Sequence, residues 1–235
     1  MTGTVVNALV IILGGLAGTA FGRKLKPERT ETIVHGLAIV VLVIGITPAV
    51  QTAGILGVLI CLVAGTVLGE LLNIERRLDR LGDFLRARFA RGDGRGTFTE
   101  GFVTASLLMA VGSMAVMGSL DAGLRGDCSV LYSKSVIDGL MAVTFAATLG
   151  VGVCFAALPV FVWQGALTLL ASRIAPFLSD AVVTEMSAVG GILLIGTGLN
   201  MLGLMPKRIQ VGNMLPAILL PIVYIPLAGR LAALL

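Results

Sequence analysis

Long apolar stretches divide the chain into segments of similar length, separated by short polar connectors. A helix needs about 20 mostly apolar residues to cross a hydrocarbon core of about 30 Å. Eight stretches meet this requirement, with boundaries near 4–22, 32–50, 53–72, 98–117, 131–153, 156–172, 182–204 and 213–233. The pattern therefore predicts an all-α polytopic membrane protein, with residues 1–235 forming a single transmembrane domain.

The fifth and sixth stretches run together through CFAALPVFVWQ, where Pro159 is the residue that favours a break. Seven spans result if this segment is one kinked helix, and eight if it is two.

Basic loops are retained in the cytoplasm. The connectors 23–30 and 73–97 hold 4 and 7 of the 17 lysine and arginine residues. Eight spans also place Lys207 and Arg208 inside, so we favour eight, with both termini on the periplasmic or extracellular side.

Composition supports a lipid-embedded chain. The protein is 57% hydrophobic and 13% charged, with a mean hydropathy of +1.01, whereas soluble domains carry roughly 25% charged residues. Glycine is abundant and aromatic residues are few, as in helices that pack closely through small side chains. Gly14, Gly18 and Gly22 are spaced four apart and form a packing face, from which we predict a homodimer. The net charge of +4 lies mainly in the basic loops, so we expect no nucleic-acid partner.

The connector 73–97 has the pattern of an amphipathic helix. Its large apolar residues recur every three or four positions, with arginine on the other face: Leu78, Leu81, Phe84, Leu85 and Phe89. We expect this helix to lie flat on the inner leaflet, where its arginines meet the anionic headgroups of membrane lipids. A solvated cytoplasmic linker between the two parts of the domain is the alternative.

Two segments about 150 residues apart resemble each other. GRKLKPERTETIVHGLAIVVLVIG (22–45) and SRIAPFLSDAVVTEMSAVGGILLIG (172–196) share a basic residue, a proline-containing connector, acidic residues and threonine, and a span that ends in Ile-Gly. If spans 1–3 repeat as spans 6–8, the odd shift of five crossings makes the repeat inverted, as in many secondary transporters. A chance likeness between two apolar hairpins is the alternative.

The stretch GSLDAGLRGDCSVLYSKSVID (118–138) is the most polar part of the apolar region. Its glycines are expected to interrupt the helix. Asp121 pairs by spacing with Arg125, and Lys134 with Asp138; Asp127 precedes the next helix as a cap. One interpretation is an ordinary outer loop with one cap and two ion pairs. The other is the entry to a permeation path, with Asp138 about two turns inside its helix.

Other polar residues lie inside the predicted spans. Asn7, Asn200 and Asn213 can bond across helices, and packing is the more common role of such residues. His35 is the single histidine, a proton relay or an interfacial residue. Glu185 lies one turn into the seventh span and ranks second to Asp138 as a transport residue.

Enzymatic motifs are missing from the sequence. It contains no HExxH, no GxSxG and no Walker phosphate loop, and one histidine leaves no catalytic triad. The three cysteines form no CxxC pair, so they indicate neither a metal site nor a disulfide framework. We expect no cofactor. An aspartate-only intramembrane hydrolase, with Asp121 or Asp127 facing Asp138, is the remaining enzymatic alternative. We expect the protein not to be an enzyme.

Three segments resemble one known family over essentially the whole chain. They are GTVVNALVIILGGLAG, VGSMAVMGSLDAGLRGDCSVLYSKSVIDG and EMSAVGGILLIGTGLNMLGL, the last followed by VGNMLPA. They look like the signature segments of the YdfK/YqgA-type bacterial inner-membrane proteins, a domain of unknown function. The resemblance implies a multi-pass protein of the bacterial cytoplasmic membrane and brings no functional residues with it.

From the residues we expect a transporter or channel for a small ion, a cation or a proton-coupled substrate. Asp121, Asp127 and Asp138 would line the outer approach, with Lys134 tuning their charge and Glu185 and Asn200 completing the path. The alternative is a non-transporting membrane scaffold or sensor that binds lipid or a partner through its basic amphipathic helix.

Overall fold

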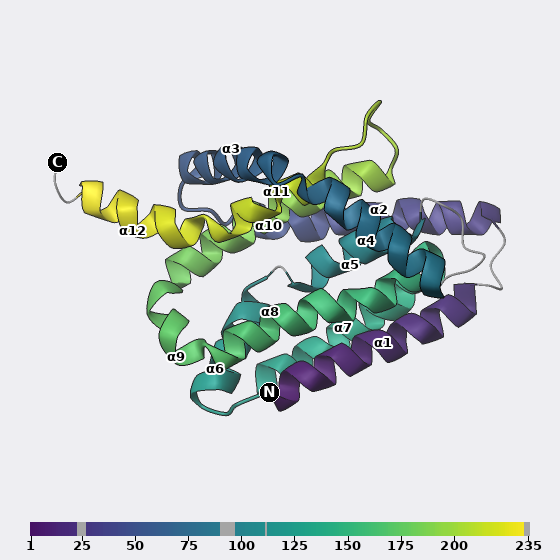
Figure 1. The fold of residues 1–235 in the computed structure, drawn as a ribbon, viewed down its shortest axis with the longest axis horizontal. Coiled ribbons are helices and arrows are strands. Elements are labelled where there is room, and N and C mark those ends of the chain that lie inside the picture. The colour runs from purple at the N-terminus through teal and green to yellow at the C-terminus, as the bar shows by residue number, and fades with distance from the viewer. Residues whose placement is uncertain (23–26, 90–96, 111, 233–235) are drawn as a thin grey trace.

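A computed structural model describes residues 1–22, 27–89, 97–110 and 112–232, and the described part is helical with no strand (Figure 1). In chain order, the elements are α1 (Thr2–Gly22), α2 (Pro27–Ala49), α3 (Ile55–Leu71), α4 (Ile74–Phe89), α5 (Thr97–Ala110), α6 (Ser113–Leu124), α7 (Ser129–Leu149), η1 (Gly150–Ala156), α8 (Ala157–Leu169), α9 (Ala171–Ile174), η2 (Ala175–Phe177), α10 (Asp180–Met201), α11 (Val211–Met214), η3 (Leu215–Leu219) and α12 (Pro221–Ala232). The expected all-α class is confirmed.

Some breaks fall where the sequence analysis did not place them. The chain turns at Gly150, with a φ of 78°, and passes through η1 before α8 begins. Pro159 is the third residue of α8, where its missing N–H would have no partner within the helix, so it does not interrupt it. Gly118 and Gly123 lie inside α6 and do not break the helix, contrary to our expectation. The turn before α7 uses Gly126, with a φ of 70°.

Two expected spans are bent pairs of shorter helices. α5 and α6 meet at about 60° around Gly112, with a φ of 138°, and the segment from Val211 to Leu219 meets α12 at 43°. Pro221 begins α12 at this second bend and Pro226 lies inside it. The last span therefore bends where Pro221 begins its second helix. The fourth span was expected as one stretch at 98–117, and nothing in the sequence distinguished Gly112 from the many other glycines.

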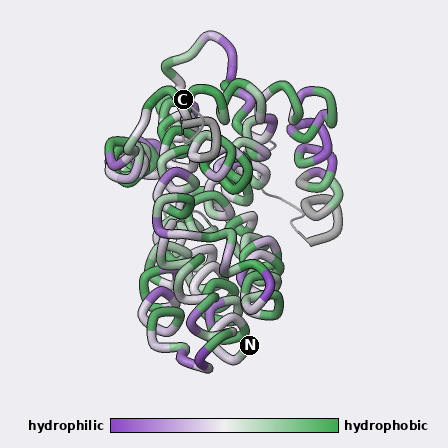
Figure 2. The backbone as a smooth tube through the Cα atoms, turned by 90° about the vertical axis from the view of Figure 1, so that its left-hand side faces the viewer, coloured by the Kyte–Doolittle hydropathy of each residue, from purple (hydrophilic) through white to green (hydrophobic). Residues whose placement is uncertain are grey.

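Helix α3 places small residues inside and large apolar residues outside. In α3, Gly57, Gly65 and Gly69 are buried against the segment from α11 to α12, while Ile55 and Leu56 are more than 60% exposed. This is the reverse of a soluble core, because lipid tails solvate leucine and isoleucine as well as a protein interior does. Figure 2 shows hydrophobic positions along most of the helical tube.

α1 and α7 lie parallel with their backbones in contact. A Cβ atom at Gly18 would meet the backbone carbonyl of Val143, and one at Gly22 would meet that of Ala147. Gly14 likewise faces Gly139. The glycine face from which we predicted a homodimer is therefore filled by α7 of the same chain. A homodimer stays a prediction, but this face does not provide its interface.

Other helices are paired in opposite directions. α2 crosses α10 with Gly45 against Gly191 and Leu42 against Gly198, an antiparallel order. α8 lies antiparallel to α1, since Gly15 meets Cys154 and Met1 reaches Gly165. In Figure 1, α1, α7 and α8 lie together on one side of the bundle, and α2, α3, α10 and α12 lie together on the other.

Within the described residues, four stretches are long and apolar enough to cross a membrane alone: Thr2–Gly22, Arg29–Ala49, Ser129–Leu169 and Asp180–Met201. Three bent pairs raise the number of candidate spans to seven at most. The protein thus has the build of a multi-pass helical membrane protein. By length and composition alone, the number of candidate spans does not reach eight, because Ser129–Leu169 counts as one stretch. Within this stretch, however, α7 and α8 run in opposite directions.

The contact between α1 and α7 predicts the effect of adding one methyl group. Gly18→Ala places a Cβ against the backbone of Val143, which cannot rotate away, so we expect a loss of about 1–3 kcal/mol of stability. Gly36→Ala in α2 is the control, because a Cβ there meets nothing within 4 Å. Thermal unfolding of the detergent-purified proteins measures both; equal midpoints for the two variants would contradict the tight α1–α7 contact.

Candidate functional site

A buried ion pair lies near the middle of α7. Lys134 Nζ donates to both carboxylate oxygens of Asp138, at 2.7 Å to Oδ1. The two residues are 6% and 2% exposed. Their spacing of four residues places both side chains on one face of the helix. The pairing predicted from this spacing is confirmed.

Two amide side chains from other helices extend this pair. Asn7 Nδ2 of α1 donates to Asp138 Oδ2 at 2.9 Å and to Gln164 Oε1 of α8 at 3.2 Å. Both amide residues are fully buried. We call Asn7, Lys134, Asp138 and Gln164 the polar cluster. It joins three helices whose residues are up to 157 positions apart in the sequence.

The polar cluster is balanced in charge. An isolated charge in an apolar interior costs several kcal/mol, and a partner in hydrogen-bond contact offsets much of that cost. Lys134 supplies the partner for Asp138, and Asn7 adds a neutral donor to the same carboxylate. The carboxylate is therefore held by donors from two helices.

Sequence analysis missed Gln164. It is a single amide within PVFVWQGALTLL, and its role depends on α8 packing against α1. The only available signal was its polarity in an apolar span, the property that singled out Asn7.

The structure places Asp121 and Asp127 outside the polar cluster. Asp121 pairs with Arg125 at 3.5 Å, as its spacing predicted, and the arginine side chain is 77% exposed. Asp127 accepts from the backbone N–H and the hydroxyl of Ser129 in the turn before α7. These hydrogen bonds lower the pKa of Asp127, which is exposed. The N-cap of α7 is Cys128, without a side-chain cap bond, so the prediction that Asp127 caps this helix was wrong by one residue. Asp121 lies inside α6 rather than in the loop. Both acids nevertheless have local partners, as in our first interpretation of this stretch.

The candidates in the second half of the chain bind backbone groups or a connector. Glu185 is 6% exposed and accepts from Thr52 Oγ1 at 2.7 Å and from Ala53 N–H at 2.8 Å. Asn200 Nδ2 donates to the carbonyl of Ile209, and Asn200 Oδ1 accepts from the N–H of the same residue. These contacts fasten loops to α10, and they do not bring either residue to the polar cluster.

Two further candidates also lie away from the polar cluster. Asn213 accepts from the backbone N–H of Glu75 and donates to Gln210, and Glu75 in turn accepts from Gly212 N–H. This exchange joins the start of α4 to the start of α11. His35 is exposed on α2. Neither position contributes to the buried polar centre.

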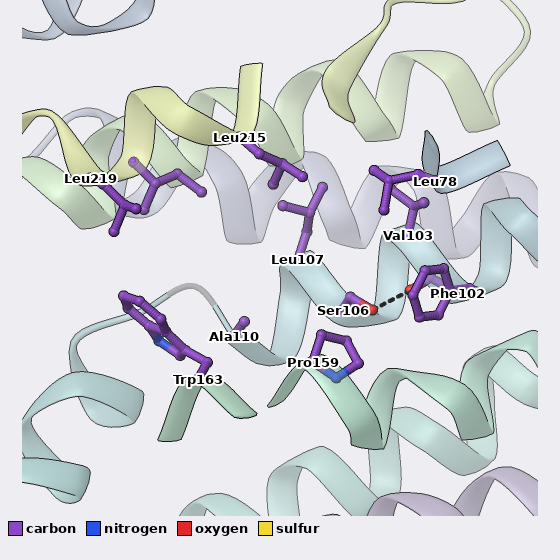
Figure 3. A pocket seen from close by; sticks show the side chains of 11 residues that line it. Leu78, Phe102, Val103, Ser106, Leu107, Ala110, Pro159, Trp163, Leu215 and Leu219 are labelled. Atoms are coloured by element: carbon purple, nitrogen blue, oxygen red, sulfur yellow. Dashed lines mark hydrogen bonds between the residues drawn. The ribbon is translucent and has the colours of Figure 1, made fainter. Parts of the chain in front are cut away.

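A separate cavity of about 270 Å³ lies where α4, α5, α8 and η3 meet (Figure 3). Trp163 and Pro159 project from α8 toward Leu107 and Ala110 of α5, and Leu215 and Leu219 close the opposite side. The lining is almost wholly apolar, and the hydroxyl of Ser106 donates a hydrogen bond to the backbone carbonyl of Phe102. Such a cavity suits a hydrocarbon group, so it is not an ion site.

The expected amphipathic helix is α4. Leu78 packs on Phe98 and Phe102, whereas Leu81 and Phe84 are 39% and 65% exposed. Arg76, Arg77 and Arg80 are exposed on the same helix. The side chains of Leu85 and Phe89 lie outside the described residues.

These features define a multi-pass helical membrane protein with one charge-balanced polar cluster in its interior. The chain belongs to the family described as proteins of unknown function, DUF554, whose model matches residues 2–225. It is 31% identical over 229 residues to the uncharacterized membrane protein YdfK of Bacillus subtilis strain 168, covering 96% of both chains. It is also 31% identical over 224 residues to the uncharacterized protein YqgA of Escherichia coli strain K12, covering 93% of both chains. No solved structure matches. The resemblance stated from the sequence is confirmed.

The buried pair predicts a non-additive effect on stability. Lys134→Met leaves the carboxylate of Asp138 without its counter-charge, and Asp138→Asn leaves the ammonium unpaired, so each single change should cost about 3–5 kcal/mol. The double variant removes both charges and should cost clearly less than the sum of the single changes. Thermal unfolding in detergent measures the cycle. Arg125→Ala is the control for a mainly exposed pair and should change little; strictly additive losses at 134 and 138 would argue against the ion pair.

Proposed function

We propose that the protein moves a small ion across the membrane and that the polar cluster is the intramembrane part of its path. The observation that carries the proposal is the burial of Asp138 and Lys134 near the middle of α7, among helices whose outward faces are apolar. Ionisable groups at such depth are rare and mark ion or proton paths more often than surface charges do. The proposal includes no enzymatic step and no cofactor.

Protons suit the polar cluster better than a metal cation. Both oxygens of Asp138 already accept from Lys134, and one also accepts from Asn7. A metal cation would have to lie beside the ammonium of Lys134, which repels it, whereas a proton changes the charge of the pair without needing a coordination shell. We therefore propose proton movement or proton-coupled transport. Asp121, Asp127, Glu185 and Asn200, which we expected on the path, have no place in this proposal.

The proposal includes eight crossings and an inverted repeat. Opposite directions of α7 and α8 support counting two crossings between Ser129 and Leu169. An inverted repeat makes each helix antiparallel to its counterpart. The pairs α1 with α8, α2 with α10, and α3 with the segment from α11 to α12 have this relation. We also propose that the chain resides in the bacterial inner membrane, with both termini on the periplasmic side.

Ion flux in proteoliposomes tests the proposal. The native protein should carry a current when a proton gradient or one of a panel of cations and anions is imposed, and Asp138→Asn should reduce it at least about tenfold, as expected when an essential proton-transfer group is removed. Asp180→Asn is the matched control, because it removes an exposed carboxylate at the start of α10. Electroneutral exchange is followed in parallel with a pH dye inside the vesicles. A native protein silent in both assays, or full flux in Asp138→Asn, would refute the proposal.

A second candidate function rests on α4. Its exposed Leu81 and Phe84 stand beside exposed arginines, the arrangement of a helix that lies in the lipid interface. A scaffold or sensor that binds anionic lipid through this helix would need no ion path. The polar cluster would then serve packing alone.

Fluorescence can locate α4 relative to the bilayer. Trp163 is the single tryptophan, so Phe84→Trp combined with Trp163→Phe reports on position 84 alone. We expect lipids brominated near the headgroup to quench it more than lipids brominated at the chain end, because interfacial helices bury their apolar face only about 5–10 Å deep. The native chain, which reports on Trp163, is the comparison. A tryptophan at 84 that no brominated lipid quenches would show a solvated linker and remove the basis of the second function.

A further inference from the structure

Five buried polar atoms of α1 and α8 have no hydrogen-bond partner among the residues that the structure describes. One of them, Trp163 Nε1, belongs to a side chain that lines the apolar cavity of Figure 3. The other four are Thr4 Oγ1, Asn7 Oδ1, Gln164 Nε2 and Thr168 Oγ1. All four residues are at most 6% exposed. Buried polar atoms of folded proteins are almost always paired with protein groups or with ordered water. Four such atoms on two neighbouring helices therefore indicate a common partner.

The orientation of both amides follows from Asp138. The carboxylate accepts only, so Asn7 must turn Nδ2 toward it, and the same Nδ2 requires the oxygen of Gln164 as its second acceptor. A flip of either amide would bring two donors or two acceptors together. Asn7 Oδ1 and Gln164 Nε2 are consequently left as one free acceptor and one free donor.

Thr4 and Thr168 lie on the same helix faces as the two amides, closer to one end of the bundle. Thr4 precedes Asn7 by three residues on α1, and Thr168 follows Gln164 by four on α8, so each shares the face of the amide on its own helix. Because α1 and α8 are antiparallel, both threonines lie on the same side of the amides. A Cβ at Gly123 would meet the carbonyl of Thr168, and Gly123 is exposed near the end of α6. The threonines thus lie between the polar cluster and the exposed turn before α7.

We propose that Thr4, Asn7, Gln164 and Thr168 hold a short file of water molecules that connects the α6–α7 end of the bundle with Asp138. A water molecule can accept from Gln164 Nε2 and donate to Asn7 Oδ1, and each threonine hydroxyl can do both. Together they offer the two to four polar partners that a buried water needs. The file gives protons access to Asp138 from this side, and in this it rests on the proposed function.

Cysteine labelling tests the file without measuring transport. Thr4→Cys and Thr168→Cys are made in a Cys128→Ser background and placed in lipid nanodiscs, where a charged methanethiosulfonate reagent reaches both sides. The controls, Val5→Cys and Ala166→Cys, lie beside the same helix positions but on exposed, lipid-facing sites. The Cys128→Ser chain, which keeps the buried Cys61 and Cys154, gives the blank.

Both test cysteines should react at least about tenfold faster than the controls. A thiol in an apolar environment has a raised pKa, and each pKa unit of this rise removes about nine-tenths of the reactive thiolate. Rates as slow as the controls at both positions would overturn the file. Reaction at only one of the two positions would also overturn it, since a continuous file needs water at both threonines. Fast labelling without any ion flux would refute the proposed function but not the water file. Ion flux without labelling would refute the water file but not the proposed function.

Discussion

The contact between the backbones of α1 and α7 determines where the polar cluster forms. Gly14, Gly18 and Gly22 let the two helices approach until a Cβ atom would meet a carbonyl group, and the parallel order then brings Asn7 level with Asp138. In a membrane, such close approach is the main source of helix association, because burial of apolar groups gives little advantage over lipid. The glycines therefore position a donor for the carboxylate although none of them is polar.

The ion pair sets the chemical character of the interior. Lys134 and Asp138 cancel in charge, so the bundle can hold them at depth, yet each depends on the other for its solvation. In the proposed transport, an ion would either compete with the ammonium or change the protonation of the pair. Proton movement requires the smaller rearrangement, since the hydrogen bond from Asn7 can persist with either protonation state of the carboxyl group.

Local features of the sequence were predictable, and distant contacts were not. Spacing of four residues predicted the pairs Asp121 with Arg125 and Lys134 with Asp138, and apolar length predicted the helices. The link from Asn7 to Gln164 joins residues 157 positions apart, and no local pattern encodes it. The turn at Gly150 was missed for a related reason, because its positive φ is a property of the fold. Pro159 gave the stronger local signal for a break. It lies in the first turn of α8, where proline is tolerated.

A buried ion pair is by itself weak evidence for transport, since such pairs also serve to fix one arrangement of helices. The surrounding amides distinguish the two roles. A purely structural network is expected to close on itself, with every donor and acceptor satisfied, because each unpaired buried group costs about 1–3 kcal/mol. Here Asn7 Nδ2 donates to both the carboxylate and Gln164 Oε1, and the other amide atom of each residue has no partner among the described residues. The threonines one turn further along α1 and α8 extend these unpaired atoms toward the exposed turn before α7. Packing alone does not require such unpaired atoms, so they support the proposed access of water to Asp138.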